Sequence, residues 1–278
     1  MRIDRRTLIT ALAAAPVLTA AAAAVRGTPA QAATDTYASN TALYSDASVV
    51  EGVDYGRRSR RHQQDDLSLT ARSPFMRTTV IAPHGGGIEV GTSELCLAIA
   101  GYHPADLTPA PAAGPVHDFW MFEGLRPSGN SDLHVTSTHC DDTTARSLCA
   151  GSLNVLSLHG CTAGQAGLEA GAQAVLVGGL GAAFRQYLTE EFTAAGIRAV
   201  TASGEEEIAG ISPENICNRS LTGAGAQLEI TTDLRTALFA PGRNTRAERA
   251  TNTLPLFWAF TAAVRTAIER VEAGQTVR

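Results

Sequence analysis

Two side chains that commonly bind metal ions, His84 and Glu89, lie on either side of three consecutive glycines at 85–87. The apolar, β-branched run 78–81 comes just before them and predicts a buried strand that ends at this glycine turn. On a helix, residues five apart face directions about 140° apart, so the two side chains could not share a ligand there. Glycines allow a tighter turn. Imidazole and carboxylate together are typical of zinc sites that keep one position open for water.

His159 is the natural third ligand, because it ends the apolar run 154–158 and is followed by Gly160. We therefore expect His84, Glu89 and His159 to bind one Zn²⁺ ion. The alternative for each histidine alone is an ordinary core or surface residue. His139 also follows a strand-like run, but we expect it to lie around the site or to contact substrate rather than to bind the ion.

A zinc site that activates water also needs a base, and Glu229 is our candidate. It interrupts the run Leu228-Glu229-Ile230, which otherwise predicts a buried strand. A buried carboxylate without a partner is costly, so it is normally found near a cation. The alternative is a glutamate that faces solvent from an edge strand.

Asn218 and Arg219 form a pair suited to binding a carboxylate. A guanidinium can donate two parallel hydrogen bonds to a carboxylate, and an asparagine amide can add another. The pair predicts a substrate that carries free carboxylates. The alternative is a surface arginine without such a role.

Strand-like and helix-like segments alternate along most of the chain. The predicted strands are 78–81, 118–122, 133–138, 154–160, 174–179, 197–201 and 226–230, and the predicted helices are 92–100, 181–195 and 254–272. This alternation predicts a single α/β domain with a mixed, mostly parallel sheet and helices on both faces. Ligands of such sheets bind beyond the carboxyl ends of the strands, where His84 and His159 would lie.

Residues 1–32 have the pattern of an export signal. Arg5-Arg6 precedes a long apolar segment at about 8–25, and Ala30-Gln31-Ala32 fits a cleavage site. We expect a twin-arginine signal, a hydrolase domain at 33–278 and a secreted protein without a stable membrane anchor. An ordinary secretory signal or an anchor is the alternative.

The chain is acidic, with a net charge of −5. Without residues 1–32, which carry four arginines and one aspartate, the net charge is −8. This balance argues against nucleic acid as a partner. The basic run 57–61 predicts a solvated surface.

Five cysteines suit an oxidising compartment but leave one unpaired. Cys140 could pair with Cys149, and Cys161 with Cys217. Spacing alone does not decide the connectivity.

At these residues the sequence resembles the phage-type poly-γ-glutamate hydrolases, a zinc-dependent family with a carboxypeptidase A-like fold. The segments that carry the resemblance are APHGGGIEVGTSEL (82–95), FEGLRPSGNSDLHVTSTHCDD (122–142), LSLHGC (156–161), VGGLG (177–181), PENICNR (213–219) and QLEITTDLR (227–235). The resemblance implies His84, Glu89 and His159 as zinc ligands, Glu229 as the catalytic carboxylate and Asn218-Arg219 as the substrate-binding pair. It also implies internal cleavage of the γ-amide bonds of an anionic polymer.

Three features depart from the family pattern: a Pro- and Ala-rich stretch near 103–116, the cysteines, and the acidic net charge. An acidic protein repels a polyanion at long range. Local arginines such as Arg126, Arg219 and Arg235 would have to offset this repulsion.

We therefore expect a secreted zinc hydrolase that cleaves poly-γ-glutamate. Two alternatives stay open. One is a zinc amidase or peptidase that acts on cell-wall γ-glutamyl links or acylated amino acids. The other is a non-catalytic or nucleic-acid-binding phage-related protein.

Overall fold

A seven-stranded sheet forms the centre of the molecule. The computed structural model describes residues 35–62, 67, 69–70, 77–110, 115–205 and 208–275. The strands are β1 (Tyr55–Arg60), β2 (Thr78–Gly86), β3 (Asp118–Gly124), β4 (Asn154–Cys161), β5 (Val175–Gly178), β6 (Ala199–Thr201) and β7 (Ala226–Thr231). Their order across the sheet is β1-β3-β2-β4-β7-β5-β6.

The sheet is mixed, with a parallel centre. Strands β3, β2, β4 and β7 run parallel to one another. Strand β1 is antiparallel to β3, and β5 is antiparallel to β7, with β6 parallel to β5. The predicted mixed, mostly parallel α/β sheet is confirmed.

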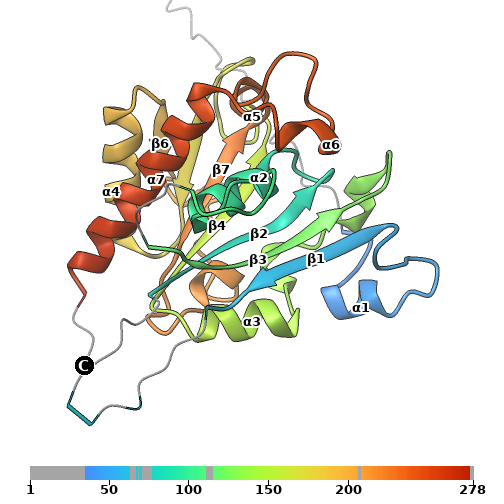
Figure 1. Cartoon of the computed structure of the whole chain (residues 1–278), viewed down its shortest axis with the longest axis horizontal. Coiled ribbons are helices and arrows are strands. Elements are labelled where there is room, and N and C mark those ends of the chain that lie inside the picture. Colours follow the sequence, from blue (N-terminus) through green and yellow to red (C-terminus); the bar gives the residue numbers. More distant parts are fainter. Residues whose placement is uncertain are drawn as a thin grey trace, which may run out of the picture.

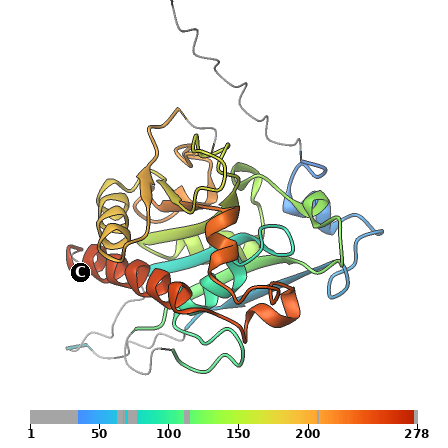
Figure 2. The same ribbon diagram turned by 90° about the horizontal axis from the view of Figure 1, so that it is seen from above.

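Helices cover both faces of the sheet (Figure 1). The helices are α1 (Asn40–Tyr44), α2 (Thr92–Ala100), α3 (Thr143–Ala150), α4 (Ala182–Ala194), α5 (Thr232–Ala237), α6 (Arg246–Arg249) and α7 (Pro255–Ala273). One core cluster joins α2, α4 and α7 to one face of the strands. A second joins α1 and α3 to the opposite face. Figure 2 shows α4 and α7 side by side along one side of the molecule.

The central strands are buried on both faces, which explains their continuous apolar runs. Every described residue of β2 and β7 is buried, as is every residue of β4 except Gly160. Because β2, β4 and β7 are parallel neighbours, their carboxyl ends meet at one edge of the sheet. This edge carries His84, His159 and Glu229.

The predicted strand 133–138 is wrong. Its place is taken by two short 3₁₀ helices, Asn130–Leu133 and Ser137–His139, with extended backbone between them. Leu133 and Val135 are buried, so the alternation of apolar residues is real. However, the Thr136 amide donates to the side chain of Asp35 (2.6 Å) rather than to a neighbouring strand.

Strand β1 was not predicted. It pairs with β3 along six residues and forms an edge of the sheet. Only Tyr55 of β1 is buried, while residues 57–60 are exposed, so its sequence is polar. The solvated basic run predicted at 57–61 is thus exposed, but most of it lies on a strand.

The predicted export signal at 1–32 lies outside the described residues. In the part of the chain that the structure describes, no helix has the length and apolar character needed to cross a membrane. All five cysteines are buried as free thiols, so neither of the two pairings left open is formed.

Candidate metal centre

The glycine turn after β2 brings Glu89 back toward His84. The Glu89 amide donates to the His84 carbonyl (2.8 Å), which closes the turn. Gly86 has φ +67°, and a Cβ there would lie 2.3 Å from the Gly124 carbonyl oxygen. A Cβ at Gly85 would lie 2.3 Å from the Ser93 hydroxyl. Glycine is therefore required at both positions by the backbone angle or by the available space.

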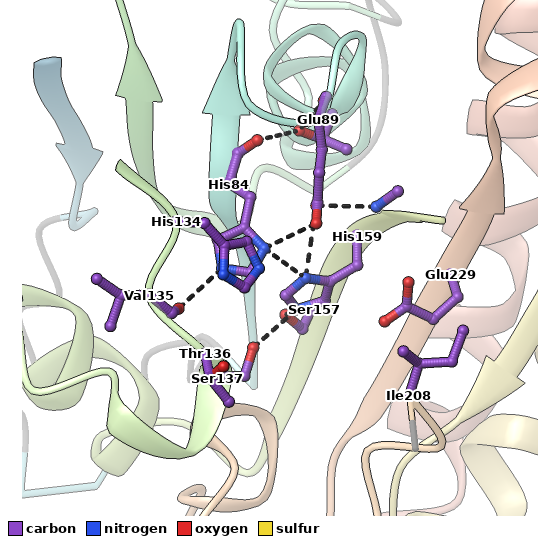
Figure 3. A network of polar contacts seen from close by, with 12 residues as sticks. His84, Glu89, His134, Val135, Thr136, Ser137, Ser157, His159, Ile208 and Glu229 are labelled. Carbon is purple, nitrogen blue, oxygen red and sulfur yellow. Dashed lines mark hydrogen bonds and ion pairs between the residues drawn. The ribbon is translucent and has the colours of Figure 1, made fainter. Parts of the chain in front are cut away.

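The three predicted metal ligands lie together at the carboxyl edge of the sheet (Figure 3). His84, Glu89 and His159 each offer one ligand atom, and these three atoms lie within 4.8 Å of one another. His84 Nδ1 lies 2.9 Å from Glu89 Oε1 and 3.1 Å from His159 Nδ1. The local glycine turn and the parallel pairing of β2 with β4 produce this convergence.

The hydrogen bonds of His84 leave a gap suited to a cation. His84 Nε2 lies 2.9 Å from the Val135 carbonyl oxygen, which can only accept, so Nε2 carries a proton. In neutral His84, Nδ1 is then a bare acceptor that faces the Glu89 carboxylate, another acceptor. A divalent cation between these atoms would satisfy both lone pairs.

His159 is oriented in a similar way. Its Nε2 lies 2.9 Å from the Ser157 hydroxyl and 3.0 Å from the Ser137 hydroxyl, while Nδ1 faces the cluster. The outer nitrogens of both histidines are thus held by protein groups, as is common for imidazoles that bind metals. The residues present fit a zinc ion.

Glu89 is held as a carboxylate. Burial alone would raise its pKa, but a positive charge at His84 and His159 together with their hydrogen bonds outweighs burial and holds the pKa well below its usual range. On neutral imidazoles, a bound divalent cation would supply that charge. Glu89 Oε2 also accepts a hydrogen bond from the Gly160 amide (2.8 Å). An ionised carboxylate is the form that binds a metal.

Glu229 lies beside this cluster because it is the register partner of His159 across β4 and β7. It is 5 % exposed, so the alternative of a solvent-facing glutamate is excluded. Burial raises the pKa of Glu229 well above its usual value, and the charge of Glu89 adds to the rise. A carboxyl group with a raised pKa is suited to accept and return a proton near neutral pH.

A cavity of about 280 Å³ opens over these residues. Besides His84, Glu89, His159 and Glu229, its lining is mainly hydroxyl, amide and small apolar groups. The other lining residues are His134, Thr136, Ser137, Thr138, Gly160, Cys161, Gln165, Ile208, Gly210, Ile211, Ser212, Asn215 and Gln227. None of the lining residues that the structure describes is an arginine.

The structure does not bring Asn218 and Arg219 to the cavity. Asn218 is 3 % exposed, and its amide makes four hydrogen bonds, to the Gly210 and Ser212 carbonyls and from the Leu180 and Gly225 amides. Arg219 donates to the backbone carbonyl and carboxylate of Glu214. The geometry therefore does not support the predicted contact of this pair with a substrate carboxylate.

The other two arginines expected near the substrate are also paired elsewhere. Arg126 bonds to Asp54 (2.8 Å). Arg235 donates to the carbonyls of Ile230 and Val90, and its guanidinium lies against Gly160, where a Cβ would approach it to 2.5 Å. Neither lines the cavity.

His134 is the histidine of the cavity lining that the sequence did not predict. Its ring lies against that of His84 with centroids 3.9 Å apart and planes tilted by 37°, and its Nδ1 lies 2.6 Å from Asp35 Oδ1. His139, which we expected near the site, is exposed and does not line the cavity. His134 lies within the run 133–138 and His139 directly follows it, so the local pattern does not separate them; His134 alone has the contact with Asp35, 99 residues away.

Comparison with known proteins gives consistent results. Residues 57–263 match the model of the poly-γ-glutamate hydrolase family. The UPF0714 protein YndL of Bacillus subtilis (strain 168) is 35% identical over 196 residues, which are 70% of this chain and 69% of YndL. The SPbeta prophage-derived UPF0714 protein YoqZ of the same organism is 36% identical over 163 residues, or 59% of this chain and 52% of YoqZ.

Two solved structures share the fold. A bacteriophage poly-γ-glutamate hydrolase matches with a TM-score of 0.69 and 30% identity, over 87% of this chain and 100% of that chain. The zinc-free form of YndL matches with a TM-score of 0.68 and 30% identity, over 86% and 99% of the two chains. The closer likeness to carboxypeptidase A stays a prediction. On these matches, the chain belongs to the poly-γ-glutamate hydrolase family.

Proposed function

We propose that this protein is an exported zinc hydrolase that cleaves the γ-glutamyl amide bonds of poly-γ-glutamate at internal positions. Its family membership supports the reaction class and the polymer. The observation that carries the metal dependence is the acceptor-to-acceptor contact of His84 Nδ1 with Glu89 Oε1, beside His159 Nδ1. A zinc-free structure of YndL is consistent with a zinc site in that relative.

The roles of the residues follow from their positions. His84 and His159 would hold the ion through Nδ1, and Glu89 through its carboxylate. Zinc bound there would polarise the amide carbonyl and lower the pKa of water. Glu229 takes the proton from the attacking water and returns it to the leaving nitrogen. Because Glu229 is buried beside Glu89, its raised pKa favours this exchange.

Neutral groups in the cavity bind the polymer in this proposal. No described lining residue is an arginine, so hydroxyls and amides would receive the substrate carboxylates, among them Thr136, Thr138 and Ser212. Neutral donors hold a carboxylate without the strong attraction of a guanidinium. This arrangement suits a polymer that must pass through the site and be released.

We also propose export by the twin-arginine route, with residues 1–32 removed. The supporting feature is the sequence Asp4-Arg5-Arg6-Thr7-Leu8 before the apolar segment. Secretion would place the hydrolase where an extracellular polymer is available.

The test combines metal analysis with product length. The purified protein should contain zinc and shorten poly-γ-glutamate chains to mixed intermediate lengths, as internal cleavage requires. Glu229→Gln should retain the metal and lose activity by about 10²–10⁴-fold, the range typical of a lost general base. A matched control is Glu214→Gln, because Glu214 is exposed and bonds only Arg219 among its described side-chain partners.

Other outcomes would contradict the proposal. Full activity of Glu229→Gln would exclude Glu229 as the general base. Activity that survives treatment with a chelator would exclude a catalytic role for the metal. Cleavage of peptidoglycan fragments or acylated amino acids, with poly-γ-glutamate left intact, would keep the zinc chemistry but replace the substrate. Release of single residues from one end would exclude internal cleavage.

A further inference from the structure

Two buried amide side chains connect the loop before β7 to the proposed catalytic carboxylate. Asn215 Nδ2 donates to Gln227 Oε1 (2.9 Å), and Gln227 Nε2 donates to Glu229 Oε1 (2.9 Å). Asn215 is 5 % exposed and Gln227 4 % exposed, and both line the cavity. Neither residue has a role in the site as described so far.

The direction of this hydrogen-bonded chain is set by the backbone. The Cys217 amide donates to Asn215 Oδ1 (3.0 Å), so the oxygen of Asn215 must point there and its NH₂ group toward Gln227. Gln227 Oε1 is then the acceptor, and its NH₂ group donates to Glu229 and to the Ile208 carbonyl (3.1 Å). Turning either amide over would place two donors or two acceptors face to face.

The loop that supplies Asn215 is itself fixed. Asn218 binds the carbonyls of Gly210 (2.7 Å) and Ser212 (2.8 Å) from within the protein. Gly210 packs so closely that a Cβ there would lie 2.9 Å from the Gln227 amide. Asn218, which the sequence suggested for substrate binding, thus holds the loop against Gln227.

We propose that Gln227 and Asn215 are positioning residues for Glu229, an inference that rests on the proposed function. The Gln227 amide occupies Glu229 Oε1, which leaves Oε2 without a partner among the described residues and free to face the cavity. The same donor favours the ionised carboxylate against its burial. Asn215 acts one step further away, because it prevents the Gln227 amide from turning over.

The experiment uses the zinc-loaded enzyme on poly-γ-glutamate. Gln227→Met keeps the size of the side chain and removes the donor. We expect kcat to fall by about 10–100-fold, the range for residues that orient an active group, with KM and zinc content unchanged. The acidic limb of the kcat/KM profile should move to higher pH, because Glu229 loses a bond that favours its charged form. Gln275→Met is the control, since Gln275 also bonds a buried amide, that of Asn154, but does not line the cavity.

A second variant, Asn215→Asp, tests the hydrogen-bonded path from Asn215 through Gln227 to Glu229 without changing Gln227 itself. The aspartate keeps the shape of the side chain but cannot donate to Gln227, so kcat should fall as it does in Gln227→Met. The double variant should be no worse than Gln227→Met alone, because both changes break one path.

Three results would overturn the inference: an unchanged kcat and pH profile in Gln227→Met, a rise in KM alone, or effects of the two changes that multiply. Failure of the proposed function differs from these results. In that case wild type would be inactive, or Glu229→Gln would stay active.

Discussion

Glu89 and Glu94 are two largely buried carboxylates five residues apart, and they differ in their partners. The Glu89 side chain is 13 % exposed and faces two imidazoles, His84 and His159. The Glu94 side chain is 7 % exposed and accepts a hydrogen bond from Arg249 Nε (3.1 Å). Arg249 also donates to the Gly86 carbonyl (3.0 Å), so the Glu94–Arg249 pair helps to fix the backbone of the glycine turn.

The difference shows what distinguishes a ligand site from a structural ion pair. A guanidinium is always charged and has no lone pair to offer, so the charge of Glu94 is balanced by Arg249 without a further ion, although Glu94 Oε2 itself accepts no hydrogen bond from the described residues. In the Glu89 cluster, the Nδ1 atoms of neutral His84 and His159 carry lone pairs and no proton, so a cation is needed to balance the carboxylate. Burial of a carboxylate therefore does not by itself mark a metal site.

The largest expected effect is the loss of activity when Glu89 is replaced. Glu89→Gln should lower hydrolysis by more than the factor of about 10–100 typical of residues that only orient a ligand. The reason is that a neutral amide replaces the only anionic ligand of the cluster. Steady-state assays measure the loss, and Glu94→Gln is the control that should keep activity close to wild type per folded molecule. Equal losses in both variants would refute the distinction.

For the Glu94–Arg249 pair, we expect the loss of one partner to reduce stability rather than activity. Arg249→Met leaves Glu94 as a buried charge without its partner and should lower the free energy of unfolding by about 3–5 kcal/mol. Arg243→Met is the matched control, since the Arg243–Glu248 pair is exposed and should contribute only about 0–1 kcal/mol. Urea unfolding followed by circular dichroism measures both. Similar small losses would show that the buried pair is not structural.

The glycine turn joins the two carboxylates and can be tested separately. An alanine at Gly86 has to adopt φ +67° and collide with the Gly124 carbonyl, whereas Gly52 has φ +86° with nothing within 4 Å of a Cβ. Gly52→Ala should cost about 1–2 kcal/mol for the left-handed backbone alone. Gly86→Ala should cost more and also lower activity, because the turn that carries Glu89 must move. An active Gly86→Ala enzyme would contradict this account.

The smallest expected effect is a pH dependence at Glu94. Burial raises the pKa of Glu94 above its usual 4.5, despite Arg249. A carboxyl with a raised pKa stabilises the fold below its unfolded pKa and loses that contribution as pH rises through the folded one. Wild type should therefore lose stability relative to Glu94→Gln as the pH rises above about 4.5 and through the raised pKa of Glu94. Unfolding titrations of both proteins give the difference, and a constant difference would exclude the effect.

The sequence predicted the parts of the fold and site that depend on local pattern. The continuous apolar runs of β2 and β4 reflect burial on both faces, and their His-Gly ends mark the ligand edge. Glu229 could be predicted because a charge inside an apolar run needs a partner. These residues depend on strand periodicity and on the ends of parallel strands.

The parts that failed depend on distant contacts. Strand β1 has a polar sequence because only one of its residues is buried, so no periodicity marks it. Asn218 has the residue type of a substrate ligand, but bonds to Gly210 and Ser212 already use its amide. His134 reaches the site through Asp35, and spacing alone could not separate it from His139.

Metal content measured by elemental analysis tests the central claim most directly, in the wild type and in Glu89→Gln and Glu94→Gln. The account predicts one zinc ion per chain in wild type and in Glu94→Gln, and little or none in Glu89→Gln. A wild-type protein that binds no divalent ion, or a Glu89→Gln variant that binds it as well as Glu94→Gln does, would contradict the account.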